Sequence, residues 1–220
     1  ATFAGDEIAA GLGGTHLHAE GRLFPVRITH VGDRPPDRQE LVERVEQALT
    51  RAANDPGDVL VFLPGKGEIH AVYERLAPRR DITTLTLHGG LTLDEQARVF
   101  EPAQKRKVIL CTNVAETSLT VPGVGVVIDS GLVRRTRYHQ GRGFLTLMPI
   151  ADDSAEQRAG RAGRTAPGVC YRLWSQATRL APATPPEVHR ESLVPLVLGA
   201  AGAGVSVRAL PFLDPPKEHA

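Results

Sequence analysis

The run Gln157-Arg158-Ala159-Gly160-Arg161-Ala162-Gly163-Arg164 has residue types and spacing that could do chemistry. Arginine recurs every three residues, at 158, 161 and 164, so on a helix the guanidinium groups would lie near one face. Adjacent like charges are unfavourable on a helix unless an anion faces them. We therefore expect these arginines to meet a polyphosphate, while Gly160 and Gly163 admit a phosphate or another backbone. A solvated basic helix face is the alternative.

A second run, CTNVAETSLT at 111–120, directly follows an apolar segment. Hydroxyl and amide side chains placed between a strand end and a helix start can donate to phosphates. Ordinary capping of the helix is the alternative. The pair His16 and His18 has no third ligand nearby, so we expect it on the surface rather than at a metal. No Ser/His/Asp arrangement and no paired acidic motif suggests a hydrolase of another kind.

Several elements must position these runs. Apolar segments at 26–31, 59–63, 84–88, 107–111 and 124–128 alternate with helical patterns. Segment 26–31 alternates with polar residues, whereas 59–63 does not, which is typical of a strand covered on both faces. The order predicts an α/β fold with a parallel sheet. Ligands bind such sheets at the carboxyl ends of the strands, so we expect the chemistry in the loops after Leu63, His88, Cys111 and Ile128.

The pattern changes after Asp129. Segments 132–138 and 144–148 alternate around a Gly-rich turn, which predicts an antiparallel hairpin. We expect a helix from about 153 to 160, a strand at 169–174, a proline-rich segment at 181–187 and a short helix at 193–198. Earlier in the chain, Thr92 and Glu95 form a capping box that starts a helix ending near Phe100.

Length and charge limit the class of protein. The chain has 220 residues, about one and a half domains, with 26 basic and 25 acidic side chains and a net charge of +1. This composition argues against disorder and against a uniformly basic nucleic-acid binder. The charge is uneven, however, because segment 134–172 carries eight arginines and three acids. Only four basic residues are lysines, and arginine suits bidentate phosphate contacts, although a GC-rich genome explains the bias equally well.

The two cysteines, Cys111 and Cys170, lie in apolar runs without CxxC spacing, which predicts buried thiols in a reducing compartment. No apolar run approaches the ~18 residues of a membrane span, and no signal peptide is visible, so we expect a cytoplasmic chain. The sequence begins at Ala1 without an initiator methionine, and we expect it to be part of a longer protein.

These segments together resemble a known family. VLVFLPGKGEI (59–69), LHGGL with EQARVFEP (87–102), CTNVAETSLT (111–120), VVIDSG (126–131) and QRAGRAGR (157–164) look like the motor motifs of the second RecA-like domain of DEAH-type superfamily 2 RNA helicases. GRLFPV (21–26) and PPEVHRESLVPLVL (185–198) are similar to bacterial HrpB-type members. The resemblance implies a RecA-like, P-loop NTPase-type fold over 25–180, an end of the interdomain segment at 1–24, and a linker with the start of a winged-helix region at 181–220.

The resemblance also implies roles for individual residues. Gln157, Arg161 and Arg164 would be catalytic, reaching the γ-phosphate of ATP across a cleft between two domains, with the arginines as fingers. Phe100 would stack on the base, and Ser118 would couple the nucleotide state to the grip on RNA. The RNA backbone would be contacted by Gly65, Thr112, Asn113, Thr117 and Thr120. The hairpin would lie near the point of strand separation, its arginines (Arg134, Arg135, Arg137 and Arg142) facing either RNA or solvent.

Some family features are missing. The chain has no GxxxxGK[ST] and no Asp-Glu-x-His, so ATP and Mg²⁺ would be held mainly by the first RecA-like domain of the same protein. The resemblance then implies a chain that is inactive alone and binds single-stranded nucleic acid, foremost RNA. Pro122 and Pro64 depart from the family pattern, at a ribose-contacting position and at a hydroxyl position respectively. The alternative function is a non-catalytic RecA-like module that binds RNA or protein.

Overall fold

The computed structural model describes residues 5–17, 24–117, 120–139 and 142–216. It divides into two compact units. The larger comprises Arg22–Arg134 and Leu147–Ala183, and the smaller comprises Ala1–Gly21, Arg135–Thr146 and Thr184–Ala220. The motor motifs at 59–69, 87–102, 111–120, 126–131 and 157–164 belong to the larger unit.

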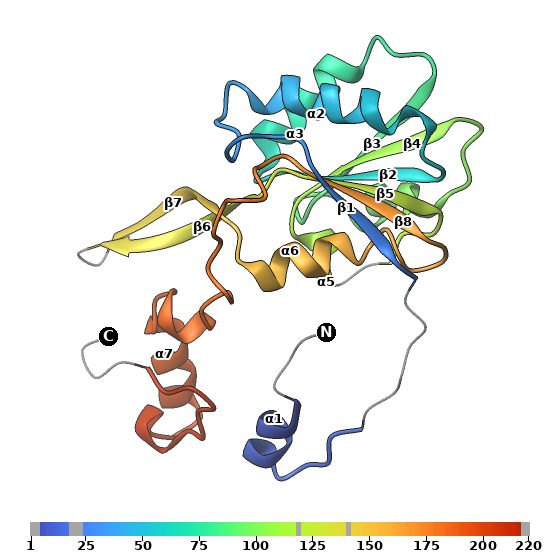
Figure 1. The fold of residues 1–220 in the computed structure, drawn as a ribbon. Coiled ribbons are helices and arrows are strands. Elements are labelled where there is room, and N and C mark those ends of the chain that lie inside the picture. The colour runs from blue at the N-terminus through green and yellow to red at the C-terminus, as the bar shows by residue number, and fades with distance from the viewer. Residues whose placement is uncertain (1–4, 18–23, 118–119, 140–141, 217–220) are drawn as a thin grey trace. The chain divides into compact units, whose positions relative to one another are not determined.

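The larger unit is built on a six-stranded sheet in the order β1-β8-β5-β2-β4-β3 (Figure 1). All of its neighbouring strands run parallel. The strands are β1 (Val26–His30), β2 (Asp58–Phe62), β3 (Ile82–Leu87), β4 (Arg106–Cys111), β5 (Val124–Asp129) and β8 (Gly168–Arg172). The predicted parallel α/β fold is therefore confirmed, and strand boundaries differ from the prediction by one or two residues.

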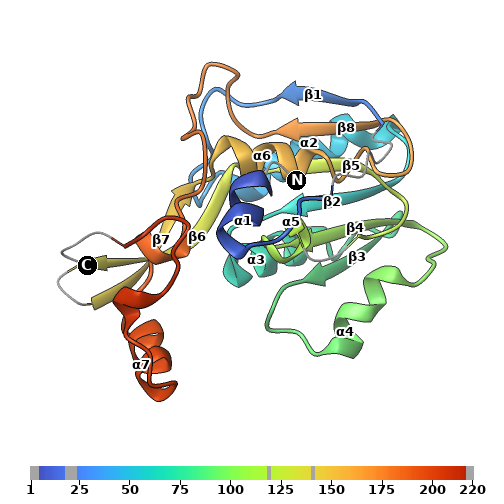
Figure 2. The same cartoon turned by 90° about the horizontal axis from the view of Figure 1, so that it is seen from below.

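Helices cover both faces of the sheet because successive strand residues point to opposite sides. Val59 and Val61 pack with α2 (Leu41–Arg51) and α3 (Lys66–Leu76) in one buried cluster. Leu60 and Phe62 belong to a second cluster with η2 (Arg98–Phe100), α5 (Val114–Thr117) and α6 (Asp152–Ala159). Figures 1 and 2 show α2 and α3 on one side of the sheet and α5 and α6 on the other. Two buried faces explain why the central strand β2 does not alternate with polar residues.

The connections on the sheet's N-terminal edge are packed backbone against backbone. Gly57 has φ of 87°, and a Cβ built on it would lie 2.7 Å from the amide nitrogen of Gly125. Glycine is required here both for the left-handed conformation and for the close approach. The 3-10 segment η1 (Ala52–Asn54) and the strand β2 flank this crossing. The starts of β2 and β5 are thus in direct backbone contact at this edge.

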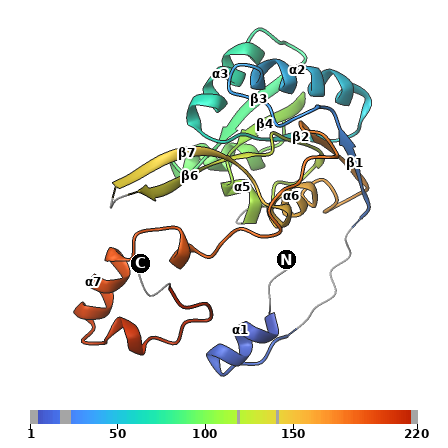
Figure 3. The same ribbon diagram turned by 60° about the vertical axis from the view of Figure 1, so that its left-hand side comes forward.

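The predicted antiparallel hairpin is confirmed as β6 (Leu132–His139) and β7 (Arg142–Pro149), a two-stranded sheet of its own (Figure 3). Thr92 and Glu95 form the predicted capping box at the start of α4 (Leu93–Ala97), and η2 continues it to Phe100. Both Cys111 and Cys170 are free and buried, as predicted.

The smaller unit contains α1 (Gly5–Leu12), η3 (Glu187–His189), α7 (Val194–Gly202) and η4 (Val207–Ala209). The sequence interpretation did not predict α1, and it ended the last helix four residues early, at 198. His16 Nδ1 donates to the carboxylate of Asp6 at 2.9 Å, while His18 lies outside the described residues. None of the helices in the described part of the chain is long and apolar enough to cross a membrane.

Candidate nucleotide and nucleic-acid interface

The loops after β2, β3 and β4 meet at one edge of the sheet, because these three strands are parallel neighbours. Backbone bonds join them there: Leu63 N–H donates to Cys111 O at 2.8 Å, and Thr112 N–H donates to Leu87 O at 3.2 Å. Asn113 is exposed and Thr112 is partly buried at this edge. The structure therefore brings these two predicted RNA-contacting residues together.

The other predicted residues of that run are described unequally. Thr117 ends α5, and its side chain is not described. Ser118 lies outside the described residues. Thr120 is exposed, and its hydroxyl accepts a hydrogen bond from Arg164.

Gly65 lies under an internal ion pair. It is buried, and a Cβ built on it would lie 2.9 Å from Cδ of Arg134. The Arg134 guanidinium donates to buried Glu68 at 2.6 Å, and Arg38 lies 3.5 Å from the same carboxylate. Although burial opposes it, Arg134 lowers the pKa of Glu68. Glycine at 65 thus admits Arg134, which is paired with Glu68 and remains 27% exposed; whether it also contacts RNA stays a prediction.

The remaining hairpin arginines belong to the smaller unit. Arg135 donates to the hydroxyl of Thr184 at 3.0 Å. The side chains of Arg137 and Arg142 are not described. Whether Arg142 contacts RNA therefore stays a prediction.

The arginine-rich run does not form one helical row. Helix α6 ends at Ala159, and residues 160–163 continue in tight turns closed by the bonds Arg161 N–H to Arg158 O and Gly163 N–H to Gly160 O. Gly163 admits another backbone: its Cβ would lie 2.5 Å from Phe24 O, and Phe24 N–H donates to Gly163 O at 2.9 Å. The helix predicted from about 153 to 160 is confirmed as α6, but the three arginines do not share one helical face, because the chain leaves the helix before Arg161.

Arg158 is a core residue. Its side chain is 1% exposed and bonds Glu116 at 3.0 Å and Asp129 at 2.9 Å. The guanidinium also lies 4.9 Å from the centre of the Phe62 ring. Although burial opposes it, Asp129 and then Glu116 raise the pKa of Arg158, so this arginine remains charged. It cannot meet a polyphosphate, contrary to the expectation from the arginine spacing.

Arg161 and Arg164 turn toward the neighbouring loop instead. Arg161, 7% exposed, donates to the backbone carbonyl of Glu116, and exposed Arg164 donates to Thr120. Burial and the nearby charge of Arg164 both lower the pKa of Arg161. Two cations are therefore held close together beside segment 112–120, which is where an anion would be favoured.

Gln157 and Phe100 are also available for a ligand. Gln157, in the last turn of α6, is half-buried, and its side chain makes no hydrogen bond within the described part of the chain. Phe100 ends η2 with 38% of its surface exposed, while the preceding Val99 is the residue that enters the core. Phe100 is therefore not a core residue.

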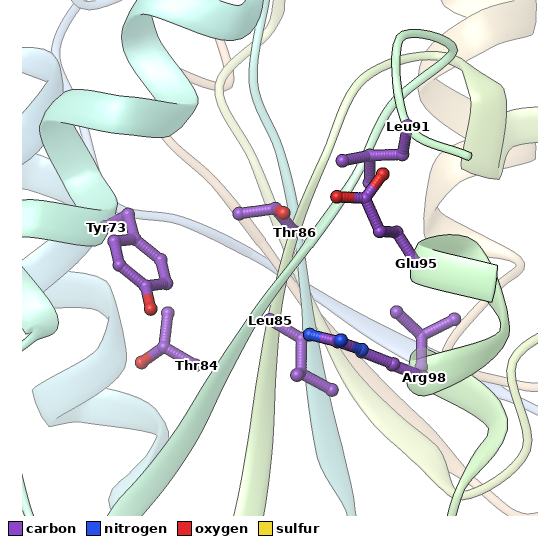
Figure 4. Close-up of a pocket in the computed structure, with 8 residues that line it drawn as sticks. Tyr73, Thr84, Leu85, Thr86, Leu91, Glu95 and Arg98 are labelled. Carbon is purple, nitrogen blue, oxygen red and sulfur yellow. The ribbon is translucent and has the colours of Figure 1, made fainter. Parts of the chain in front are cut away.

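A separate hollow lies at the outer strand of the sheet. It has a volume of about 140 Å³, and Figure 4 shows Tyr73 and Thr84 on the α3 side of β3 with Glu95 and Arg98 on the α4 side. Its lining contains none of the predicted site residues. The candidate interface is thus the set of strand-end loops and not this hollow. Among the described residues, no three His, Cys, Asp or Glu side chains come together as metal ligands.

Comparison with known proteins bears on this arrangement. The family model for the helicase conserved C-terminal domain matches residues 40–166, more than half of the chain. The chain belongs to this family. The match contains the strand-end loops and the run with Arg158, Arg161 and Arg164.

Individual relatives define the type of this helicase domain. It is 37% identical over 219 residues to a probable ATP-dependent RNA helicase DHX35 homolog of Caenorhabditis elegans, covering 93% of this chain and 30% of that protein. It is 38% identical to the probable ATP-dependent RNA helicase DHX34 of Mus musculus, covering 91% of this chain and 19% of that protein. The chain thus spans less than a third of the length of these curated relatives.

Solved structures give the same result. A crystal structure of the Escherichia coli DEAH/RHA helicase HrpB superposes with a TM-score of 0.87 at 33% identity, covering 99% of this chain and 29% of that one. A second, of the E. coli DExH-box NTPase HrpB, gives 0.85 at 32% identity over 99% of this chain and 28% of that one. The predicted resemblance to the C-terminal domain of DEAH-type helicases is confirmed.

The sequence interpretation of this helicase domain missed its internal carboxylates. Glu116 accepts from both Arg158 and Ser154, the latter at 2.6 Å, and Asp129 accepts from Gly131 N–H at 2.9 Å. Burial raises the pKa of Asp129, and Arg158 opposes that shift. The sequence signal that could have revealed them is one acidic residue in each of two motifs that follow apolar strands, Glu116 in 111–120 and Asp129 in 126–131. These two carboxylates join two motif segments, 111–120 and 126–131, to the guanidinium of Arg158.

Proposed function

We propose that this chain is the second motor domain of an ATP-dependent RNA helicase. In the full-length protein, Arg161 and Arg164 would act as arginine fingers toward ATP bound against the first RecA-like domain. The observation that carries the proposal is the placement of two neighbouring cations on the loop after α6, with exposed Arg164 bonded only to the neutral hydroxyl of Thr120 within the described residues. Positive charge placed there would stabilise charge that develops on a transferred phosphoryl group.

The residues fit the phosphate tail and the base of a nucleotide. Gln157 offers an amide beside the fingers, and Phe100 offers an exposed aromatic face. The chain contains no GxxxxGK[ST] and no Asp-Glu-x-His, so Mg²⁺ and the phosphate cradle would come from the partner domain. ATP with Mg²⁺ supplies the phosphoryl-transfer chemistry, while this chain contributes positive charge and orientation.

The same loop supports contact with a single strand. Arg164 bonds Thr120, and Arg161 bonds the backbone of Glu116, so the finger loop is tied to the segment that carries Thr112, Asn113 and Thr117. Hydroxyl and amide groups at the edge would contact the RNA backbone without reading the bases. A change at the nucleotide would then alter the grip on RNA, and Ser118 stays a predicted part of this coupling.

The first test uses the purified 220-residue chain. We expect it to show no ATP hydrolysis above background, with or without single-stranded RNA, because the cradle motifs are absent. Phosphate release is the measurement, and the full-length protein is the positive control. ATP hydrolysis that persists after the chain is purified a second time would contradict the proposal that the phosphate cradle lies on the first RecA-like domain.

The second test changes Arg164 in the full-length protein. Arg164→Ala should lower kcat for RNA-stimulated ATP hydrolysis by about 10³- to 10⁵-fold, the range found for arginine fingers. Arg27→Ala removes an exposed arginine, 62% exposed, from β1 and serves as the matched control with unchanged kcat. A wild-type kcat for Arg164→Ala would exclude Arg164 from the finger role.

A further inference from the structure

Lys66 and His88 lie on the two loops that flank the end of β4. Lys66 is the first residue of α3, after β2, and His88 directly follows β3. The sheet order places β4 between these strands. A Cβ built on Gly90 would collide with Lys66 Nζ, so the ammonium group lies against the turn formed by residues 88–91. Both side chains are therefore beside the edge that carries Thr112 and Asn113.

The hydrogen bonding of His88 fixes its protonation state. Gly90 N–H donates to His88 Nδ1 at 3.1 Å. A backbone N–H can only donate, so Nδ1 carries no hydrogen and the hydrogen lies on Nε2. Burial and then the charge of Lys66 lower the pKa of His88, which favours the same neutral form. Nε2–H has no acceptor within the described residues, so the ring offers one donor outward.

Lys66 has a positive charge that nearby acids do not balance. Glu68 is already bonded to Arg134 and lies 3.5 Å from Arg38. Glu95 accepts from the backbone and hydroxyl of Thr92 in the capping box. Within the described part of the chain, no carboxylate pairs with exposed Lys66. An unbalanced ammonium next to a fixed neutral donor is suited to an oxyanion with more than one acceptor oxygen.

We propose that Lys66 and His88 together bind one phosphodiester group of a single RNA strand, Lys66 as the cation and His88 Nε2–H as the neutral donor. The proposal rests on the proposed RNA-binding function and names two further residues of that site. Because both groups address a phosphate, they hold the strand without reading its bases. The charged and uncharged donors have different salt dependences, and this difference makes the proposal testable.

The experiment measures binding of a short fluorescein-labelled oligouridylate to the 220-residue chain by anisotropy over a range of salt concentrations. Lys66→Ala should reduce the slope of log K against log salt by about 0.7, the value for one cation on a single strand. Lys66→Arg should keep the slope. The matched control is Lys105→Ala, which removes an exposed lysine just before β4, at the opposite edge of the same parallel sheet, and should leave the slope unchanged.

His88 is tested with two amide substitutions. His88→Gln retains a donor near the position of Nε2, whereas His88→Asn retains only a group near Nδ1. His88→Asn should weaken oligouridylate binding about tenfold with an unchanged salt slope. His88→Gln should keep most of the wild-type affinity. His70→Asn, at an exposed histidine of α3, is the control with wild-type affinity. A purely structural role of His88 would not distinguish Gln from Asn in this way.

The possible outcomes separate this proposal from the function on which it rests. Suppose that the wild-type chain binds RNA, that Asn113→Ala weakens this binding, and that Lys66→Ala keeps the wild-type salt slope. The proposal that Lys66 and His88 bind a phosphodiester is then wrong, while the proposed RNA binding at this edge of the sheet remains. If the wild-type chain does not bind RNA, both are wrong. If Lys66→Ala weakens binding of a fluorescent ATP analogue and leaves RNA binding intact, the phosphate belongs to a nucleotide and the proposal is overturned.

Discussion

A guanidinium group that is 1% exposed, as in Arg158, is stable only when carboxylates compensate it, and here Glu116 and Asp129 do so. We expect Arg158→Met to lower the free energy of unfolding by about 3–5 kcal/mol, because it leaves Asp129 buried without its counter-ion. Urea unfolding of the chain measures this. Arg27→Met, which breaks the exposed pair with Asp55, should cost less than about 1 kcal/mol. Equal losses for the two variants would show that the buried pair contributes no more than a surface one.

The same residue marks the limit of what could be predicted for the site. Spacing alone placed the three arginines of 157–164 together, and the structure keeps Arg161 and Arg164 near one loop. The spacing could not predict that the Arg158 side chain points into the core, because the two carboxylates that bond it lie 42 and 29 residues earlier in the chain. Long-range ion pairs leave no local periodic signal.

At the scale of elements, the cap of α4 controls the segment that ends at Phe100. Thr92 and Glu95 satisfy each other's backbone amides, the sequence pattern that predicted this helix. Thr92→Ala should lower the free energy of unfolding by about 1 kcal/mol, and Thr92→Ser should retain most of it. Urea unfolding provides the comparison. An unchanged free energy of unfolding in Thr92→Ala would mean that the packing of Val99 alone holds the α4–η2 segment.

Elements with a strong local pattern were predicted and the others were not. Unalternating runs such as 59–63 gave the parallel strands, and the Gly-rich turn gave the hairpin. α6 ends within one residue of the predicted end at 160, whereas α1 was not predicted and α7 continues four residues past the predicted end at 198. Helix boundaries are the feature that single-sequence patterns define least well.

For the whole molecule, part of the positive charge of segment 134–172 is balanced by carboxylates inside the protein, which the composition does not show. Among the side chains of 134–172 that the structure describes, Arg134 is paired with Glu68, Arg158 with Glu116 and Asp129, and Arg172 with Glu156 at 2.7 Å. Three of these partners, Glu68, Glu116 and Asp129, lie outside that segment. The excess of arginine therefore builds the core as well as the proposed phosphate contacts, which a count of charges cannot distinguish.

The two thiols report on the stability of the whole larger unit. Cys111 and Cys170 lie on β4 and β8 with no exposed surface, and burial raises the pKa of both. We expect neither to react with a thiol reagent in the native chain and both to react after unfolding. Labelling at fixed reagent concentration should be faster in Arg158→Met than in Arg27→Met, since it follows the population of the unfolded state. Rapid labelling of folded wild-type chain would contradict this burial.

The bond from Phe24 N–H to Gly163 O has a practical consequence for trimming the domain. A shortened chain that starts at residue 25, the boundary expected from the sequence, would keep every strand and every catalytic candidate. It would nevertheless lose the donor that fixes the carbonyl beside Arg164, together with the backbone against which Gly163 packs. A minimal fragment that preserves the geometry of the finger loop must therefore begin upstream of Phe24.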